Sequence, residues 1–363
     1  MKLKNGFLEA LLNEIGLQKH FLADEIVETI YFGGGTPSLL SGTELSLILD
    51  AIKRNFLVDV NAEITLEANP DNITAGNLSV WKDNNINRLS IGIQSFFDAD
   101  LRWMNRGHHA TQAEESILMA KEAGFDNLTI DLIFGTPGLS DKDWYSTVQK
   151  AILLNIPHLS CYALTVEPKT ALDRMIHQKT IDGINADDQA RQFLLLIEWL
   201  TVAGYEHYEI SNYSLPGRRS RHNSSYWKGK KYLGLGPSAH SFNGISRQWN
   251  ISNNALYIQS LQKNTIPFEI EFLTPVQKLN EWIMTSLRTK EGLGFNNEAD
   301  LLNKRVIDSL KKKSKIYQQQ YLVTQTSSGL MLTDQGKLFA DRIASGLFFE
   351  DSEISEDAFA PSL

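Results

Sequence analysis

The sequence predicts an α/β fold followed by a mainly helical, winged-helix-like C-terminal domain. The first prediction depends on β-rich runs that alternate with amphipathic stretches up to about residue 170, with turn signals between them. The second depends on helical patterns that dominate from about residue 274. Strands joined by helical crossovers pair in parallel with right-handed connections, so the first part is either a partial TIM-like (β/α) barrel or a doubly wound sheet.

The length of 363 residues suits one barrel with an appendage. We expect a barrel core over residues 1–170, a barrel extension with antiparallel strands over 171–270, a helical winged-helix-like domain over 271–349 and an acidic, disordered tail over 350–363.

The sequence of the first half predicts five strands and four helical or amphipathic stretches between or before them. Gly33–Gly35 ends the first strand and Asn69–Asp71 the second. The expected strands cover residues 27–32, 62–67, 88–94, 127–134 and 158–166, and the expected helical stretches cover 5–22, 43–56, 98–124 and a segment ending near 154.

The second half predicts different elements. We expect a helix over 187–203, an antiparallel strand over 205–210, a loop over 212–245, helices over 276–287, 298–303 and 306–317, and a hairpin over 321–333. Winged-helix domains often bind DNA, but the only dense basic run is Lys311–Lys313, which is more typical of a solvated helix face.

The composition limits the class of protein. Apolar residues make up 42% and charged residues 21%, which is typical of a soluble globular protein, and the net charge of −8 disfavours an electrostatic nucleic-acid binder. No apolar run approaches 18 residues, so we expect a cytoplasmic protein. Cys161 is the only cysteine and lies in an apolar run, which predicts a buried thiol and excludes a cysteine-based metal site.

Candidate binding residues follow the predicted strands. Gly33–Pro37 follows the first strand, Glu67 and Gln94 end the next two, and Asp131 lies on the fourth. Ligands of parallel α/β folds bind at the C-terminal ends of the strands. Each residue alone is weak support, since a triple glycine is often a plain turn. Together they predict one shared ligand site.

Four motifs carry a resemblance to a known family: the Gly33–Pro37 loop, Leu66–Pro70, Arg88–Phe96 and Ile130–Gly138. Over about residues 5–345 the chain resembles the HemN/HemW family of the radical S-adenosylmethionine superfamily. The resemblance implies a partial TIM-like radical SAM barrel that lacks its first strand, and S-adenosyl-L-methionine as cofactor. By this resemblance the cofactor-binding residues are Gly34, Gly35, Thr36, Glu67, Gln94, Arg106, Asp131 and Ala163.

The chemistry of these residues agrees with that role. Glycine backbone can hold the amino acid end of the cofactor, and the carboxylate of Glu67 can accept hydrogen bonds from an ammonium or a ribose hydroxyl. Gln94 can both donate and accept, and Arg106 can form a forked pair with a carboxylate. The alternative for Arg106 is a surface salt bridge.

The segment Arg221–Trp227 contains the pattern His-Asn-x-x-Tyr-Trp. This pattern resembles the HemW branch of the family rather than its other branch, the oxygen-independent coproporphyrinogen III oxidases. Histidine is a good axial ligand for haem iron, and aromatic rings offer flat surfaces to a macrocycle. We therefore name His222, Tyr226 and Trp227 as candidate haem-binding residues. The alternative is that they pack a loop against the barrel, and His207 and His240 are weaker candidates.

In the family, a first strand runs into a Cys-x-x-x-Cys-x-x-Cys loop whose thiolates hold a 4Fe-4S cluster. This sequence enters its first helix pattern at once and lacks that segment, so we expect an N-terminally truncated chain without metal ligands. One explanation is a start codon assigned too late or a truncated chain. The other is a cluster-free paralogue that binds only haem or a partner.

The resemblance implies a haem chaperone that transfers haem to client proteins, with adenosylmethionine and a 4Fe-4S cluster acting in the full-length protein. It assigns no catalytic residue, and enzymatic activity stays open. An alternative is an oxygen-independent coproporphyrinogen III oxidase, which decarboxylates two propionates to vinyl groups. A third possibility is a nucleic-acid-binding protein that uses the winged-helix-like end.

Overall fold

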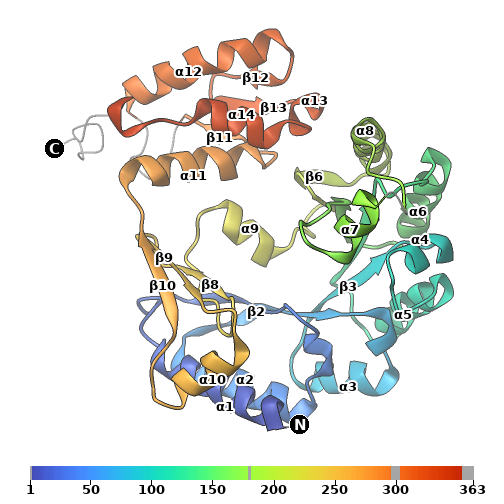
Figure 1. The fold of residues 1–363 in the computed structure, drawn as a ribbon, viewed down its shortest axis with the longest axis vertical. Helices are drawn as coiled ribbons and strands as arrows, with labels where there is room; N and C mark the ends of the chain where they lie inside the picture. Colours follow the sequence, from blue (N-terminus) through green and yellow to red (C-terminus); the bar gives the residue numbers. More distant parts are fainter. Residues whose placement is uncertain (1, 179–180, 296–302, 354–363) are drawn as a thin grey trace. The chain divides into compact units, whose positions relative to one another are not determined.

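The computed structural model describes residues 2–178, 181–295 and 303–353 (Figure 1). The chain forms two compact units, which are described separately. The first unit comprises Met1–Ile30, Leu40–Glu63 and Arg221–Leu363, and the second comprises Tyr31–Leu39 and Ile64–Ser220.

The largest sheet has seven strands in the order β1-β2-β3-β4-β5-β7-β6 (Figure 1). Its strands are β1 (Val27–Phe32), β2 (Val58–Ala68), β3 (Arg88–Gln94), β4 (Leu128–Phe134), β5 (His158–Ala163), β6 (Glu206–Glu209) and β7 (Asn212–Ser214). Strands β2 to β5 pair in parallel, and β7 is antiparallel to both β5 and β6. The first five strands are neighbours in chain order. This excludes the doubly wound alternative, which requires the strand order to reverse, and confirms the partial (β/α) barrel.

Helices connect the strands of the second unit. They are α3 (Ala75–Asp83), α4 (Asp98–Trp103), α5 (Ala110–Glu122), α6 (Asp141–Leu153), α7 (Ala171–His177) and α8 (Ala186–Val202). Figure 1 shows α3, α5, α6 and α8 on one side of the sheet. Side chains of a strand alternate between faces, and one face here is apolar and completely buried, with Leu66, Leu89 and Ile130 as examples. The opposite face is lined mainly by polar residues, so it is the face available to a polar ligand.

The first unit begins with α1 (Lys2–Leu17) and α2 (Gly42–Asn55), and α2 starts with a capping box formed by Ser41 and Glu44. A second sheet has the order β10-β9-β8. The remaining elements around it are α9 (Arg221–Trp227), β8 (His240–Phe242), β9 (Ser246–Asn250), α10 (Asn254–Leu261) and β10 (Phe268–Phe272).

The C-terminal region packs helices around a three-stranded sheet of order β11-β13-β12. Its elements are α11 (Pro275–Leu287), β11 (Leu293–Gly294), α12 (Lys304–Gln319), β12 (Val323–Gln325), β13 (Gly329–Leu332), α13 (Asp334–Lys337) and α14 (Ala340–Leu347). Leu279, Ile283, Leu310 and Leu330 form part of its buried core. The predicted hairpin is present as β12 and β13.

Several predicted boundaries differ from the structure. Helix α1 ends at Leu17 instead of 22, and β2 begins at Val58 instead of 62. The expected loop over 212–245 contains β7, α9 and β8. The expected helix over 298–303 falls almost wholly outside the described residues, as does the tail beyond 353. The domain boundaries stay a prediction.

Candidate functional site

The glycine loop after β1 has a backbone that other residues rarely adopt. Gly34 has φ +73° and Gly35 has φ +59°, and a Cβ atom at either position would contact nothing within 4 Å. A Cβ on Gly33 would instead lie 2.6 Å from Cε1 of Tyr31 and 3.0 Å from Oε1 of Glu67. The loop therefore needs left-handed backbone at two glycines and close approach at the third.

Glu67, near the end of β2, holds this loop in place. Its Oε1 accepts a hydrogen bond of 2.7 Å from the Tyr31 hydroxyl, and its Oε2 accepts one of 3.1 Å from the backbone N–H of Gly34. Burial, and then the neighbouring Glu67 carboxylate, raises the pKa of Tyr31, so the phenol stays a donor. One carboxylate thus joins the tips of the first two strands.

Gln94 ends β3 in an unusual conformation, with φ +67°. The pairing of β3 with β4 shifts register between Ile91 and Gln94, which re-aims the end of the strand. Positive φ at a residue other than glycine is uncommon and is often found at functional sites.

Gly92 marks a point where polar groups converge. A Cβ there would lie 3.0 Å from Nε2 of Gln94 and 3.2 Å from Nη2 of Arg106. Arg106 donates hydrogen bonds to Oδ1 of Asn69 at 3.1 Å and to the carbonyl oxygen of Gly92 at 3.4 Å. These bonds link Arg106 to the ends of β2 and β3, which is not the surface salt bridge considered as its alternative.

Asp131 lies on the polar face of β4, opposite Ser160 on β5. Burial raises the pKa of Asp131 to about 7, and the nearby Glu67 carboxylate adds to this rise. A hydrogen bond from Ser160 and the charges of Arg88 and Arg106 oppose it. Asp131 therefore shares one electrostatic environment with the residues at the tips of β2 and β3.

We call Gly34, Gly35, Thr36, Glu67, Gln94, Arg106 and Asp131 the strand-tip site. Hydrogen bonds and close approaches connect its members, except that Asp131 is linked to Glu67 and Arg106 through their charges and that Gly35 and Thr36 continue the loop after Gly34. Ala163, the eighth predicted residue, is the exposed last residue of β5 and pairs with Phe134. Its carbonyl oxygen accepts a hydrogen bond of 3.4 Å from the Thr165 hydroxyl, and its role in cofactor binding stays a prediction.

Three supporting residues were not singled out from the sequence: Tyr31, Asn69 and Arg88. Asn69 and Arg88 lie inside recognisable motifs, but their partners depend on the register of the sheet. Arg88 is buried and donates a hydrogen bond to Oγ1 of Thr129. The Thr129 hydroxyl is 3.0 Å from Nδ1 of His158, so a buried polar row continues beneath the strand-tip site.

The described residues do not fit a 4Fe-4S cluster. Within residues 2–178, 181–295 and 303–353, no group of three or more His, Cys, Asp or Glu side chains could hold a metal ion. Cys161 is buried, as predicted, and burial raises the pKa of its thiol, which disfavours the thiolate that a metal requires. It also alternates with Ser160 on β5 and so points away from the polar face.

A second group of candidate residues lies in the first unit, around helix α9. The backbone N–H groups of Arg221 and His222 donate to Oε2 and Oε1 of Glu63 at 3.2 and 3.0 Å. Glu63 is buried, so its carboxylate satisfies the first N–H groups of this short helix. The hydroxyl of Thr29 lies 2.9 Å from Nδ1 of His222.

Aromatic rings surround His222. Its imidazole meets Tyr226 edge-on with ring centres 5.1 Å apart, and Tyr226 meets Tyr232 at 4.7 Å. Tyr226 is 40% exposed, and Trp227 carries the Arg288 guanidinium 5.2 Å from its ring centre. We call Thr29, Glu63, His222, Tyr226 and Trp227 the histidine site. His240 stacks on Trp249 and His207 on Tyr213, so neither belongs to it.

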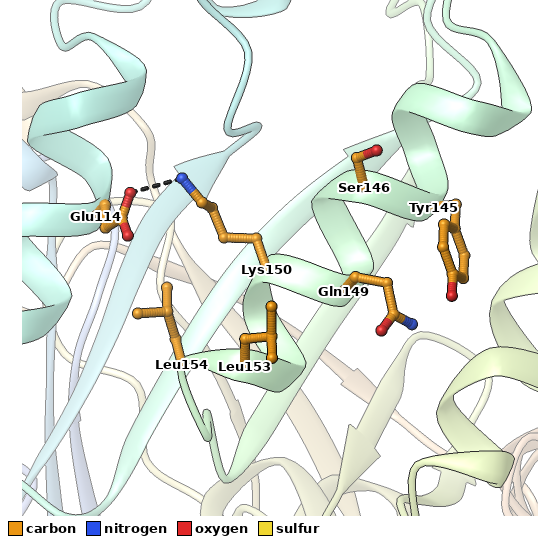
Figure 2. Close-up of a pocket in the computed structure, with 7 residues that line it drawn as sticks. All are labelled: Glu114, Tyr145, Ser146, Gln149, Lys150, Leu153 and Leu154. Atoms are coloured by element: carbon orange, nitrogen blue, oxygen red, sulfur yellow. Dashed lines mark hydrogen bonds and ion pairs between the residues drawn. The ribbon is translucent and has the colours of Figure 1, made fainter.

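A pocket of about 380 Å³ lies on the second unit, and Figure 2 shows the residues that line it. It lies along α5 and α6, with Leu153, Leu154 and Tyr145 in its wall and a 2.6 Å ion pair between Lys150 and Glu114 at one side. No residue of the strand-tip site lines it, and its wall is mostly apolar. It is therefore distinct from the strand-tip site.

The fold and the polar strand tips define a radical SAM-type barrel. The family model of the Radical SAM superfamily matches residues 9–151, and that of the HemN C-terminal domain matches residues 273–339. A solved structure of coproporphyrinogen III oxidase (HemN) from Escherichia coli superposes with a TM-score of 0.81 at 23% identity, covering 96% of this chain and 83% of that one. This likeness shows the fold.

Curated relatives identify the branch. The heme chaperone HemW of Mycobacterium tuberculosis (strain H37Rv) is 32% identical over 342 residues, which cover 94% of this chain and 86% of that protein. The heme chaperone HemW of Bacillus subtilis is 30% identical over 319 residues, covering 87% and 84% respectively. The chain belongs to the HemW family of the radical SAM superfamily.

Within the part of the chain that the structure describes, none of the helices has the length and apolar character needed to cross a lipid bilayer.

Proposed function

We propose that this chain is a HemW-type haem chaperone, which binds haem through the histidine site and transfers it to haem-requiring client proteins. The observation that carries the proposal is the fixed position of His222. Its ring is held at Nδ1 by Thr29 and its backbone by Glu63, in a family whose curated relatives are named heme chaperones. The imidazole of His222 would supply an axial ligand to the haem iron.

Tyr226 and Trp227 extend this proposal. Tyr226 is partly exposed beside His222 and offers a ring to the macrocycle, while the cation–π contact with Arg288 orients Trp227. The acidic net charge of −8 disfavours a nucleic-acid surface, because phosphate binding requires basic residues. No nucleic acid is part of this proposal, and we place the chaperone in the cytoplasm.

The strand-tip site supports binding of S-adenosyl-L-methionine. The exposed backbone of Gly34 and Gly35 leaves room for the amino acid end of the cofactor, and Glu67 and Asp131 supply acceptors for its ammonium group or ribose hydroxyls. Arg106 and Gln94 supply donors beside Gly92. Adenosylmethionine would provide radical chemistry only together with a 4Fe-4S cluster, and the described residues do not fit that cluster.

A haem titration tests the chaperone proposal. Haem added to the purified chain is expected to give a Soret shift that His222→Ala weakens at least tenfold in affinity, because an axial ligand is lost. His20→Ala is the matched control, since His20 is an exposed histidine of the same unit, and its spectrum should equal that of the parent. An unchanged spectrum in His222→Ala would remove His222 as the ligand.

The alternative, coproporphyrinogen III oxidase activity, has weaker support. The HemN structure shares the fold at 23% identity, whereas the relatives at 30–32% identity are named chaperones. A direct assay separates the two. A version of the chain that carries the cluster segment is incubated anaerobically with coproporphyrinogen III and reductant, and formation of vinyl product would overturn the chaperone proposal.

A further inference from the structure

Strand β10 is an exposed edge of the sheet β10-β9-β8 (Figure 1). All five of its residues, Phe268 to Phe272, are exposed, including three large apolar side chains: Phe268 at 42%, Ile270 at 46% and Phe272 at 69%. Contiguous apolar side chains on an open edge are unusual, because such an edge can pair with another chain.

The register shows which backbone groups face outward. Ile251 donates to the carbonyl oxygen of Pro267, and Leu273 donates to that of Ile245, at 3.0 Å each. Antiparallel pairing alternates between bonded and non-bonded positions, so Phe268, Ile270 and Phe272 stand at non-bonded positions opposite β9. Their N–H and C=O groups therefore point away from β9, toward the open edge, and no hydrogen bond to them occurs within the described residues.

The two faces of β10 differ in chemistry. Phe268, Ile270 and Phe272 share the face of Asn250, Gln248 and Ser246, which are their partners on β9. Glu269 and Glu271 lie on the other face, paired with Trp249 and Arg247. Arg247 forms a 2.8 Å ion pair with Glu281, and the side-chain amide of Gln277 donates to Oε1 of Glu271 at 3.3 Å. Glu269 and Glu271 are therefore the charged side chains that β10 itself presents on this face.

Charge disfavours the simplest occupant, which is a second copy of the strand. Antiparallel self-pairing centred on Ile270 would match Phe268 with Phe272, but it would also place Glu269 directly opposite Glu271 of the other copy. Like charges at directly opposed positions destabilise a strand pair. A partner strand that alternates apolar residues with Lys or Arg would instead match both faces of β10. Its apolar side chains would lie on the face of Phe268, Ile270 and Phe272, and its basic side chains on the face of Glu269 and Glu271.

We propose that β10 is a docking edge for an extended protein segment in which apolar residues alternate with Lys or Arg. The segment adds as a fourth strand beside β10, with its apolar side chains against Phe268, Ile270 and Phe272 and its basic side chains beside Glu269 and Glu271. Main-chain hydrogen bonds supply the pairing, and the alternation supplies the specificity. Neither the strand-tip site nor the histidine site contains a residue of β10.

A labelled peptide tests the docking edge on the whole chain. The probe is an acetylated nine-residue peptide in which valine alternates with lysine, and its binding is followed by fluorescence anisotropy at low and moderate salt. We expect saturable binding that the double substitution Glu269→Lys/Glu271→Lys weakens at least tenfold. The matched control is Glu115→Lys/Glu122→Lys, which changes the net charge equally on α5 and should leave the affinity unchanged.

Two modified peptides test main-chain pairing without altering the protein. N-methylation of every second residue removes the donors along one edge of the peptide. One of the two alternate methylation patterns is expected to abolish binding, and the other to preserve it, because only one edge meets β10. Equal binding of both patterns, or equal weakening by the α5 control, would overturn the proposal. So would concentration-dependent dimers of the chain that the β10 double substitution abolishes, because a second copy would then occupy the edge.

Discussion

Single side chains of the strand-tip site act on more than one neighbour. Glu67 binds both Tyr31 and the Gly34 backbone, and its charge helps to raise the pKa of Asp131. Arg106 binds Asn69 and the Gly92 carbonyl while opposing that rise. Because these groups are coupled, a change in the charge of one alters the protonation of the others.

Asp131 gives the strand-tip site a dependence on pH. Its pKa is about 7 in the folded chain, and a cationic ligand such as adenosylmethionine favours the ionised carboxylate. Binding should therefore release a proton below pH 7, and the affinity should fall as pH falls from 8 to 6. Asp131→Asn is expected to bind more weakly at pH 8 with a flatter profile. Isothermal titration calorimetry across this range measures both, and an equally steep profile in Asp131→Asn would contradict the assignment.

The stability of the chain without ligand provides an independent check on Asp131. The folded carboxyl, with its pKa near 7, holds a proton that the unfolded carboxyl has released above its pKa of 3.8. The contribution of Asp131 to the free energy of unfolding is therefore most favourable below pH 3.8 and declines as pH rises toward 7. Urea unfolding should show a smaller decline in Asp131→Asn than in the parent chain.

Thr29 is expected to control the ligand strength of His222. If Nδ1 of His222 donates to the Thr29 hydroxyl at 2.9 Å, Nε2 carries the lone pair that binds iron. Thr29→Val keeps the shape and removes the acceptor, so haem affinity should fall about tenfold, the lower end of such outer partner effects. Thr29→Ser should restore it. Equal Soret spectra and affinities in Val and Ser variants would mean that this hydrogen bond does not orient the ligand.

At the scale of elements, periodicity in the sequence predicts the strands of the barrel but not the shorter elements that follow them. Five strands and their order along the chain follow from periodicity and turn residues. Strand β9 was missed because its buried positions are Ser246, Gln248 and Asn250, so alternation of polar and apolar residues is absent. Helix α9 was missed because it has seven residues and none is buried.

Two glycine substitutions, both at positions where a Cβ atom would meet no neighbour, measure the effect of backbone strain alone. Gly34→Ala should lower the free energy of unfolding by about 1–2 kcal/mol, because an L-residue at φ +73° is strained although the space is open. Gly16→Ala is the matched control: Gly16 lies in helix α1 with nothing within 4 Å, so alanine should stabilise by about 0.5–1 kcal/mol. Chemical unfolding measures both. A neutral Gly34→Ala would show that the loop relaxes away from its left-handed conformation.

At the scale of the whole molecule, the sequence predicted the barrel, the C-terminal domain and the family. The strand tips were predictable because parallel strands end at one edge of a sheet, so Glu67, Gln94 and Asp131 were expected together before their contacts were known. The supporting partners were not, because the bonds from Tyr31 and Arg106 join residues 36 and 37 positions apart in the sequence. Only the register of the sheet and its shift before Gln94 bring those groups together.

The last prediction concerns the 4Fe-4S cluster, because the sequence contains only one cysteine. With Cys161 as its single, buried cysteine, the chain should stay colourless near 400 nm after anaerobic reconstitution with iron and sulfide. Adenosylmethionine should still bind, because the strand-tip site needs no thiolate, yet dithionite should release neither methionine nor 5′-deoxyadenosine. Cys161→Ser is the control and should behave identically. A brown protein, or cleavage of the bound cofactor, would mean that other residues of this chain assemble a redox centre.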